Sequence, residues 1–501
     1  MIVEKVSRND GQKSQDKRPA VQMSRLAGIL LWLHFLWSRR RFYKLMLEIP
    51  GPKGVPFLGT VPEYVINKLQ IIQRTKHMDI YGSTILIWMG INPVLLTRDP
   101  KIAEDILISS QCLNRASNIT KPISDTFESG LLTLREPEWQ QRRRNLNSSF
   151  KPNLLLNFVP IFNSEATILV NIMDNFVGQK DVLPHLLRWS FRTGCQTILG
   201  TEVKEDLDNT LIESWQSVLR SIMLCIALPF PRNKIFSSIF GFERRRAKHL
   251  DRLNAFMDDI LQQKLRKISQ NELDSPIVIN RLVDLFRSGQ IGYNHIKGEC
   301  NSTIIASLET TALTVTHTLI LLAMFPEYQD ITFEELKMVF PTSGEFDVTT
   351  DDLKKLVYMD QILNETLRLI PPVPVVMREA KNDFRLSNGV LVPRGVAMTV
   401  DIFNTHRNKD VWGPSADTFN PDHFLSENIR DRHPYAFIPF SKGRRNCIGG
   451  RYALMSAKIA LAKILRNYKL RTSFRYEDLV FIDNIGIKLD KLPLLDFHPR
   501  T

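Results

Sequence analysis

Cysteine is scarce in this 501-residue chain, and the few that are present do not form pairs. No two of them stand in a C-x-x-C arrangement, so neither a zinc site nor a disulfide framework is indicated. We therefore expect the bulk of the chain to face a reducing compartment. The five cysteines are Cys112, Cys195, Cys225, Cys300 and Cys447.

Low-complexity linkers and internal repeats are also missing. The apolar stretch near the N-terminus, Leu26 to Trp37, has only 12 residues. A helix of that length covers ~18 Å against ~30 Å of hydrocarbon, which predicts a short anchor that does not span a membrane alone. With no linker or repeat to divide the remainder, we expect one large, mostly helical domain.

The first 49 residues are predicted to be an extension. Residues 1–22 are polar and mixed in charge, which predicts disorder, although translation starting at Met23 is an alternative. Three arginines, 39–41, follow the apolar run and would place the next segment in the cytosol. The break at Ile49–Pro52 then separates this extension from a body spanning 50–501.

The net charge of +13 does not point to nucleic acid. The basic residues are spread along the chain rather than striped, and no nucleic-acid motif accompanies them. A solvated basic surface is the plain explanation. An anionic membrane or an acidic partner protein would fit the same charge.

One cysteine has a distinctive setting, in the stretch Phe440–Gly449, FSKGRRNCIG. Cys447 precedes an amphipathic run, RYALMSAKIALAKILRNY, whose helical N–H groups and dipole would favour a thiolate. Gly443 and Gly449 permit a tight turn, and Arg445 can meet an anionic group. This arrangement suits haem, which carries acidic side chains and accepts a cysteine ligand, although a simply buried cysteine is the alternative.

The same residues carry a family resemblance. Phe440, Gly443, Arg445, Cys447 and Gly449 match F-x-x-G-x-R-x-C-x-G, which resembles the cytochrome P450 haem-binding signature. The surrounding sequence is similar to insect microsomal members related to fatty-acid omega-hydroxylases. The resemblance implies a mainly α fold with small β-sheets, in which haem b lies between a long central helix and the cysteine loop, with Cys447 as the axial ligand of its iron.

Two further segments match the family in order along the chain. Trp139 and Arg143 stand at i and i+4 and would share one helix face, although a solvated basic face is the alternative. By resemblance, this W-x-x-x-R pair meets the haem propionates, and Arg378 is a further propionate partner. Glu365 and Arg368 match the structural E-x-x-R pair, on a helix that ends before Pro371. Its usual third member, an arginine, is His423 here, which we expect to give a shorter and pH-sensitive contact.

A long helix is predicted from about Asn294 to Phe325, with an acid and an alcohol at its centre. A mid-helix threonine can bond back to a carbonyl and open the helix, and self-satisfied threonines are the plain interpretation. The segment resembles the family's A-G-x-[DE]-T-T, by which Thr310 would bond dioxygen and Glu309 would feed protons. Ser307 replaces the usual glycine and is expected to narrow the oxygen groove. Ala306 lacks the carboxylate that joins haem covalently in many fatty-acid hydroxylases, so we expect non-covalent haem.

The activity implied by the resemblance is insertion of one oxygen atom of O2 into an apolar small molecule, with electrons from NADPH. The implied partners are a flavoprotein reductase, cytochrome b5 and the endoplasmic reticulum membrane, on its cytosolic face. Two alternatives are a reductase-independent haem-thiolate isomerase and a non-catalytic carrier of haem or apolar ligands. A basic docking face is expected from Lys442, Arg444 and Arg142. Apolar residues expected near the substrate are Ile304, Ile305, Val373, Val375, Val376 and the segment Ile482–Ile485.

Overall fold

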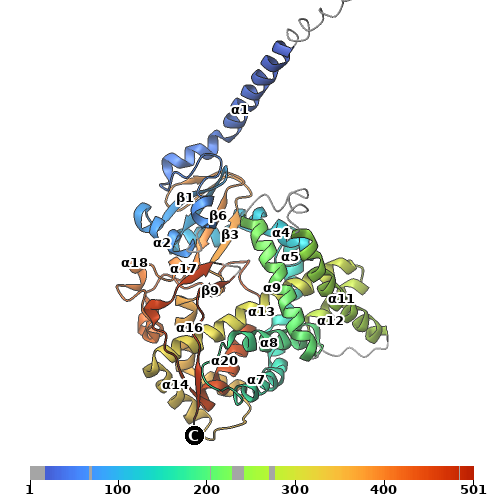
Figure 1. The fold of residues 1–501 in the computed structure, drawn as a ribbon, viewed down its shortest axis with the longest axis vertical. Helices are drawn as coiled ribbons and strands as arrows, with labels where there is room; N and C mark the ends of the chain where they lie inside the picture. Colours follow the sequence, from blue (N-terminus) through green and yellow to red (C-terminus); the bar gives the residue numbers. More distant parts are fainter. Residues whose placement is uncertain are drawn as a thin grey trace, which may run out of the picture.

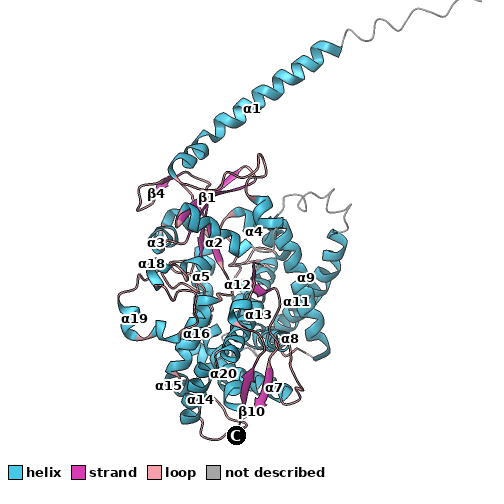
Figure 2. Ribbon diagram, turned by 60° about the vertical axis from the view of Figure 1, so that its left-hand side comes forward, coloured by secondary structure: helices cyan, strands magenta, loops and turns pink. Residues whose placement is uncertain are grey.

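The computed structural model describes residues 17–66, 70–203, 205–227, 242–269, 277–483 and 486–500. Helices form most of the molecule and the sheets are small, which confirms the predicted fold class (Figures 1 and 2). The helices are α1 (Lys17–Glu48), α2 (Gln70–Tyr81), α3 (Pro100–Ile108), α4 (Ser117–Phe127), α5 (Glu138–Asn147), α6 (Pro152–Leu155), α7 (Val159–Met173), α8 (Leu183–Gly194), α9 (Glu205–Ala227), α11 (Phe242–Ser269), α12 (Val278–Arg287), α13 (Tyr293–Met324), α14 (Pro326–Val339), α15 (Thr350–Lys355), α16 (Val357–Leu369), α17 (Ile402–Thr405), α18 (Lys409–Trp412), α19 (Ser426–Arg430) and α20 (Gly450–Asn467).

The main sheet has four strands in the order β1-β2-β6-β3. β1 and β2 form an antiparallel hairpin, and β2 then pairs in parallel with β6. Two short sheets, β8–β9 and β7–β10, come from the last part of the chain. The strands are β1 (Thr84–Met89), β2 (Asn92–Thr97), β3 (Val375–Glu379), β4 (Phe384–Arg385), β5 (Leu391–Val392), β6 (Ala397–Asp401), β7 (Tyr468–Arg471), β8 (Phe481–Asp483), β9 (Ile487–Leu489) and β10 (Asp496–Pro499).

The helix α13 runs through the middle of the body (Figure 1). Its bounds agree within one residue with the helix predicted from Asn294 to Phe325. It is apolar almost all round because α8, α16 and α20 pack against it. By length and composition it is one of two helical stretches within the described residues that could cross a membrane, the other being Pro152–Met173. Since 83% of its apolar window is buried, α13 is a core helix of the body.

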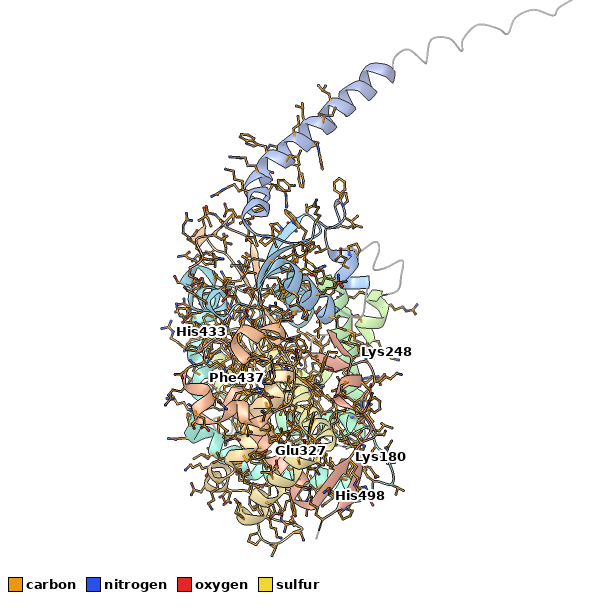
Figure 3. The ribbon with its side chains drawn as sticks, turned by 90° about the vertical axis from the view of Figure 1, so that its left-hand side faces the viewer. Lys180, Lys248, Glu327, His433, Phe437 and His498 are labelled. Carbon is orange, nitrogen blue, oxygen red and sulfur yellow. The ribbon has the colours of Figure 1, made fainter. Side chains whose placement is uncertain are left out.

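The prediction of a short N-terminal helix was wrong in length. α1 has 32 residues, about 48 Å at 1.5 Å per residue, and projects from the body (Figures 1 and 3). It includes residues 17–22, which were predicted to be disordered, while residues 1–16 lie outside the described part of the chain. The apolar run lies exposed along it, with Leu31 at 70% and Trp37 at 65% of full exposure. The helix ends before Pro50, as the Pro-Gly-Pro break predicted.

The last turns of α1 belong to the body rather than to a separate extension. Leu45 and Ile49 are buried in the core beneath the main sheet, and the Tyr43 ring stacks on Trp88. Arg39 donates to the carbonyl of Ile91 at 2.9 Å. Contacts therefore cross the boundary at residue 49 that the sequence suggested.

Candidate functional site

The cysteine loop is fixed by one backbone hydrogen bond and one glycine. The N–H of Cys447 donates to the carbonyl of Phe440 at 2.9 Å, which closes the loop ahead of α20. Gly443 has φ +75°, and a Cβ there would lie 2.1 Å from the carbonyl oxygen of Leu107. The loop therefore needs glycine at 443 both for its backbone conformation and for its packing against α3.

The Cys447 side chain is solvent accessible, although protein atoms surround it on most sides. Burial raises the pKa of the thiol, while the N–H of Gly449 and the charges of Arg143 and Arg115 lower it. The net direction is upward, although the Gly449 N–H at the start of α20 acts in the predicted direction and favours the thiolate. A cation at the sulfur would supply the missing stabilisation, as a coordinated metal does.

Three arginines with buried guanidinium groups gather beside this loop. Arg445 and Arg378 are almost fully buried, at 3% and 2% exposure. Burial, together with the positive charges of Arg115 and Arg378, lowers the pKa of Arg445 to about 8. Burial and Arg115 likewise lower the pKa of Arg378 to about 9. In the described part of the chain, Nε of Arg115 and both Nε and Nη1 of Arg445 have no hydrogen-bond partner.

Like charges with unsatisfied donors call for an anionic group, since buried charges are otherwise costly. A cofactor with two acidic side chains would fit these donors, and its metal would meet the accessible thiol of Cys447. The residues present therefore fit haem. Arg115 was missed by sequence reasoning, because it lies in no motif and only the fold brings it to Arg378 and Arg445.

Trp139 and Arg143 both contact the cysteine loop, which agrees with the prediction that they share one face of their helix. The guanidinium carbon of Arg445 lies 4.2 Å from the centre of the buried Trp139 ring. Arg143 donates to the carbonyl of Asn446 at 2.8 Å and to its side-chain oxygen at 2.9 Å. Both residues of α5 thus hold loop residues that flank Cys447.

The centre of α13 carries accessible side chains at Ala306 and Thr310 and a buried acid at Glu309. Ala306 is exposed and Thr310 partly exposed, although most neighbours on this helix are buried. Thr310 Oγ1 donates to the Ala306 carbonyl at 2.7 Å, the back-bonding predicted for a mid-helix threonine. Glu309 is buried instead, and its Oε1 accepts from Lys488 of β9 at 3.1 Å. The structure therefore directs the acid and the alcohol to different partners.

The Ser307 side chain is directed toward α8. Its Oγ donates to the Ile304 carbonyl at 3.0 Å and lies against α8, where a Cβ on Gly194 would approach it to 2.9 Å. Ser190 of α8 also donates to the Ser307 carbonyl. The hydroxyl therefore packs toward α8, where Gly194 leaves room for it, and the narrowing of an oxygen groove stays a prediction.

The E-x-x-R pair is wholly buried and fully engaged. Arg368 donates from Nε and Nη2 to the two carboxylate oxygens of Glu365, at 2.6 and 2.7 Å. Its remaining donors go to the carbonyls of His406, Ala416 and Thr418. The ring of His406 accepts from the N–H of Ile438 at 2.8 Å. This network fastens α16 to the chain that leads into the cysteine loop.

His423 stands where the third member of this frame was predicted. Its Nδ1 lies 3.1 Å from Glu365 Oε1, and its Nε2 lies 3.0 Å from Ser415 Oγ. Burial tends to raise the pKa of Glu365, but hydrogen bonds from Arg368 and His423 bring it below its usual range. The carboxylate is thus held charged in the interior by good geometry.

The predicted docking face needs one correction. Arg142 is buried and pairs with Glu299 of α13 at 3.2 Å, so it is not available to a partner protein. Arg444 is exposed, and Lys442 contacts the Pro434 carbonyl beside the Tyr435 ring. A run of basic residues in one helix could not reveal which of them faces inward.

The residues predicted to lie near substrate differ in burial. Ile304 and Ile305 belong to the main core, while Val373, Val375 and Val376 are partly buried. Ile482 of β8 is partly buried, and positions 484 and 485 lie outside the described residues.

The comparisons with known proteins agree with this site. A family model described as "Cytochrome P450" matches residues 49–489. The chain is 51% identical over 490 residues to "Probable cytochrome P450 313a3" of Drosophila melanogaster, covering 96% of this chain and 99% of that protein. It is 48% identical to "Probable cytochrome P450 313a1" of the same organism, covering 94% and 98%. It is also 27% identical to "Cytochrome P450 4c3" of that fly, covering 92% and 91%.

These matches extend over nearly the whole chain and include the segment that carries the cysteine loop. The family's cofactor is haem, in agreement with the accessible thiol and the arginine cluster beside it. The chain belongs to the cytochrome P450 family, a family of haem-thiolate monooxygenases.

Proposed function

We propose that this chain binds haem through Cys447 and hydroxylates an apolar small molecule. The observation that carries the proposal is the accessible Cys447 thiol beside buried arginines whose donors lack partners. Arg115, Arg378 and Arg445 would hold the propionates, while Trp139 and Arg143 keep Arg445 and the loop in place. Phe440, Gly443 and Gly449 shape the loop. When bound, haem supplies the activation of dioxygen.

In the proposed reaction, one atom of O2 enters a C–H bond of the substrate as hydroxyl and the other leaves as water. Two electrons from NADPH and two protons complete the balance. The electrons would pass through a flavoprotein reductase, with cytochrome b5 as a second donor. Lys442 and Arg444 are the proposed basic contacts for such an acidic partner, since both belong to the cysteine loop.

The chain's own contribution would be to hold substrate and to supply protons. Thr310 is the proposed hydrogen-bond donor on the accessible face of α13, and Glu309 the proposed proton carrier. Glu365, Arg368 and His423 are proposed to be structural, because their network reaches only the backbone of the chain that leads into the loop, at His406 and Ile438.

The proposed location is the cytosolic face of the endoplasmic reticulum membrane. The support is the exposed apolar part of α1, which projects from the body and is followed by Arg39, Arg40 and Arg41. Exposed apolar surface of this kind is expected to be covered by lipid. We propose residues 1–49 as the anchoring extension and 50–501 as the catalytic domain, although the last turns of α1 pack on that domain.

The test is a reconstituted assay. Full-length protein with haem is combined with NADPH–cytochrome P450 reductase, NADPH and a panel of apolar compounds that includes laurate and a steroid. Compounds that shift the haem absorbance spectrum away from its low-spin form are then tested by product analysis. A hydroxylated product that requires NADPH supports the proposal.

Two other outcomes would replace it. NADPH-independent conversion of a fatty-acid hydroperoxide would favour an isomerase. Bound ligand with reducible haem but no NADPH consumption on any compound would favour a carrier protein.

A further inference from the structure

The acid at the centre of α13 is held by a lysine from a distant part of the chain. Lys488 Nζ lies 3.1 Å from Glu309 Oε1, across 179 residues of sequence. The Glu309 side chain is 8% exposed and the Lys488 side chain 29%. A pair at this depth interacts more strongly than a surface ion pair, because water screens it less.

Lys488 stands on β9, whose first residues contact Pro372 and α13. The N–H of Ile487 donates to the Pro372 carbonyl at 2.9 Å. A Cβ on Gly486 would lie 2.9 Å from that same carbonyl oxygen and 3.0 Å from Leu313 Cδ1, one turn beyond Glu309. Gly486 and the start of β9 therefore pack between α13 and the turn that leads into β3.

The ion pair determines where the Glu309 carboxylate points. A free glutamate side chain samples several rotamers, and an ion pair to a fixed partner selects among them. Oε1 is occupied by Lys488, whereas the neighbouring Thr310 hydroxyl is bonded to Ala306. A proton carried by Glu309 toward the accessible face of α13 must therefore leave from a carboxylate whose orientation Lys488 sets.

We propose that Lys488 is a positioning residue for proton supply, and that it ties this supply to the β8–β9 hairpin. This proposal rests on the proposed monooxygenase function. Protons taken up from water by the Glu309 carboxylate end in the water molecule that the reaction releases. Because β8 carries Ile482, a residue expected near substrate, a ligand that shifts the hairpin would also shift the lysine that orients Glu309.

The principal test uses the full-length holoenzyme with reductase and NADPH. For Lys488→Met we expect an unchanged CO difference spectrum and continued NADPH oxidation. Product formed per NADPH should fall several-fold, and hydrogen peroxide should rise correspondingly. Lys488→Arg should restore most of the coupling, because it keeps the charge. Lys491→Met, at an exposed lysine three residues away, is the matched control and should behave as wild type. Should Lys488→Met fail to retain haem, Lys488→Gln takes its place in the same comparison.

A second measurement does not depend on activity. Glu309→Gln, Lys488→Met and the double variant form a cycle in which the unfolding midpoints of the holoproteins are compared. Non-additive midpoints are expected if the ion pair exists in solution. Additive midpoints, or wild-type coupling in Lys488→Met, would overturn the proposal. If wild type formed no product from any compound, the proposed function would fail, and the cycle would still report on the ion pair.

Discussion

The guanidinium of Arg445 stacks over the Trp139 ring with 4.2 Å between its central carbon and the ring centre. These residues belong to two motifs separated by about 300 positions, and the fold places one upon the other. The stack explains how an arginine can stay in the interior with two unpartnered nitrogen atoms. The ring faces the cation and leaves the remaining donors free for an anion.

Replacing Trp139 with leucine should therefore loosen haem without unfolding the chain. A partly desolvated cation–π contact is worth roughly 0.5–2 kcal/mol, and its loss would leave Arg445 less well oriented. We expect haem to transfer faster from the variant to apomyoglobin, followed by absorbance. Trp32→Leu, on the exposed part of α1, should leave the transfer rate as in wild type. Equal rates for wild type and Trp139→Leu would contradict this role of the stack.

Replacing Arg115 should weaken haem retention without lowering the stability of the haem-free chain. Replacement by methionine removes a buried like charge from beside Arg378 and Arg445, so the haem-free chain should become no less stable. Haem retention should weaken, because a counter-charge for the propionates is lost. Thermal unfolding with and without haem measures both effects, with the exposed Arg144→Met as control. Unchanged haem retention would remove Arg115 from the site.

The buried E-x-x-R pair should be far more sensitive to substitution than an exposed pair at the same spacing. Arg368→Met leaves Glu365 charged and wholly buried, which we expect to cost about 3–5 kcal/mol of unfolding free energy and most of the haem content. Arg475 and Asp478 are likewise three residues apart but exposed, and Arg475→Met should change stability little. Chemical unfolding of both variants, followed by far-UV circular dichroism, makes the comparison. Similar midpoints would contradict the account of the frame.

Glu299 should make stability depend on pH. Burial raises its pKa to about 7, more than the N–H of Leu131 and the Arg142 guanidinium lower it. An acid whose pKa is higher in the folded state stabilises the fold below its ordinary pKa of 4.5, and this contribution is lost as the pH rises through about 7. The full loss is on the order of 3 kcal/mol, at about 1.4 kcal/mol for each pH unit between the two values.

Glu299→Gln should flatten that dependence, because glutamine stays neutral and its oxygen can still accept from Arg142. Urea unfolding at about pH 5 and about pH 8 brackets the transition. Glu327→Gln, an exposed position, should keep the wild-type dependence. A Glu299→Gln chain with the same pH dependence as wild type would show that Glu299 is charged throughout.

Local spacing predicted much of this molecule. The cysteine loop, the E-x-x-R pair and the bounds of α13 depend on residues close in sequence, so a pattern could identify them. Arg115 and Lys488 act through partners that only the tertiary fold supplies, and nothing around them forms a motif. Arg142 was misassigned because the basic run in α5 does not show which of its faces lies against α13.

The helix α1 shows the same limit. Its apolar run predicted a 12-residue element, but the flanking polar residues continue the helix to 32 residues, because Pro19 lies in the first turn and no further proline intervenes before Pro50. The packing of the Ser307 hydroxyl toward α8 was also unpredictable from sequence. The glycine that makes room for its hydroxyl, Gly194, lies on another helix.

The most direct measurement concerns the sulfur of Cys447. Wild-type protein and Cys447→Ser are reduced, treated with carbon monoxide and compared by difference spectroscopy, with Cys112→Ser as a buried-cysteine control. We expect the strongly red-shifted Soret band of a haem thiolate in wild type and in Cys112→Ser, and its loss in Cys447→Ser. Persistence of that band in Cys447→Ser, or its absence from haem-loaded wild type, would contradict the assignment.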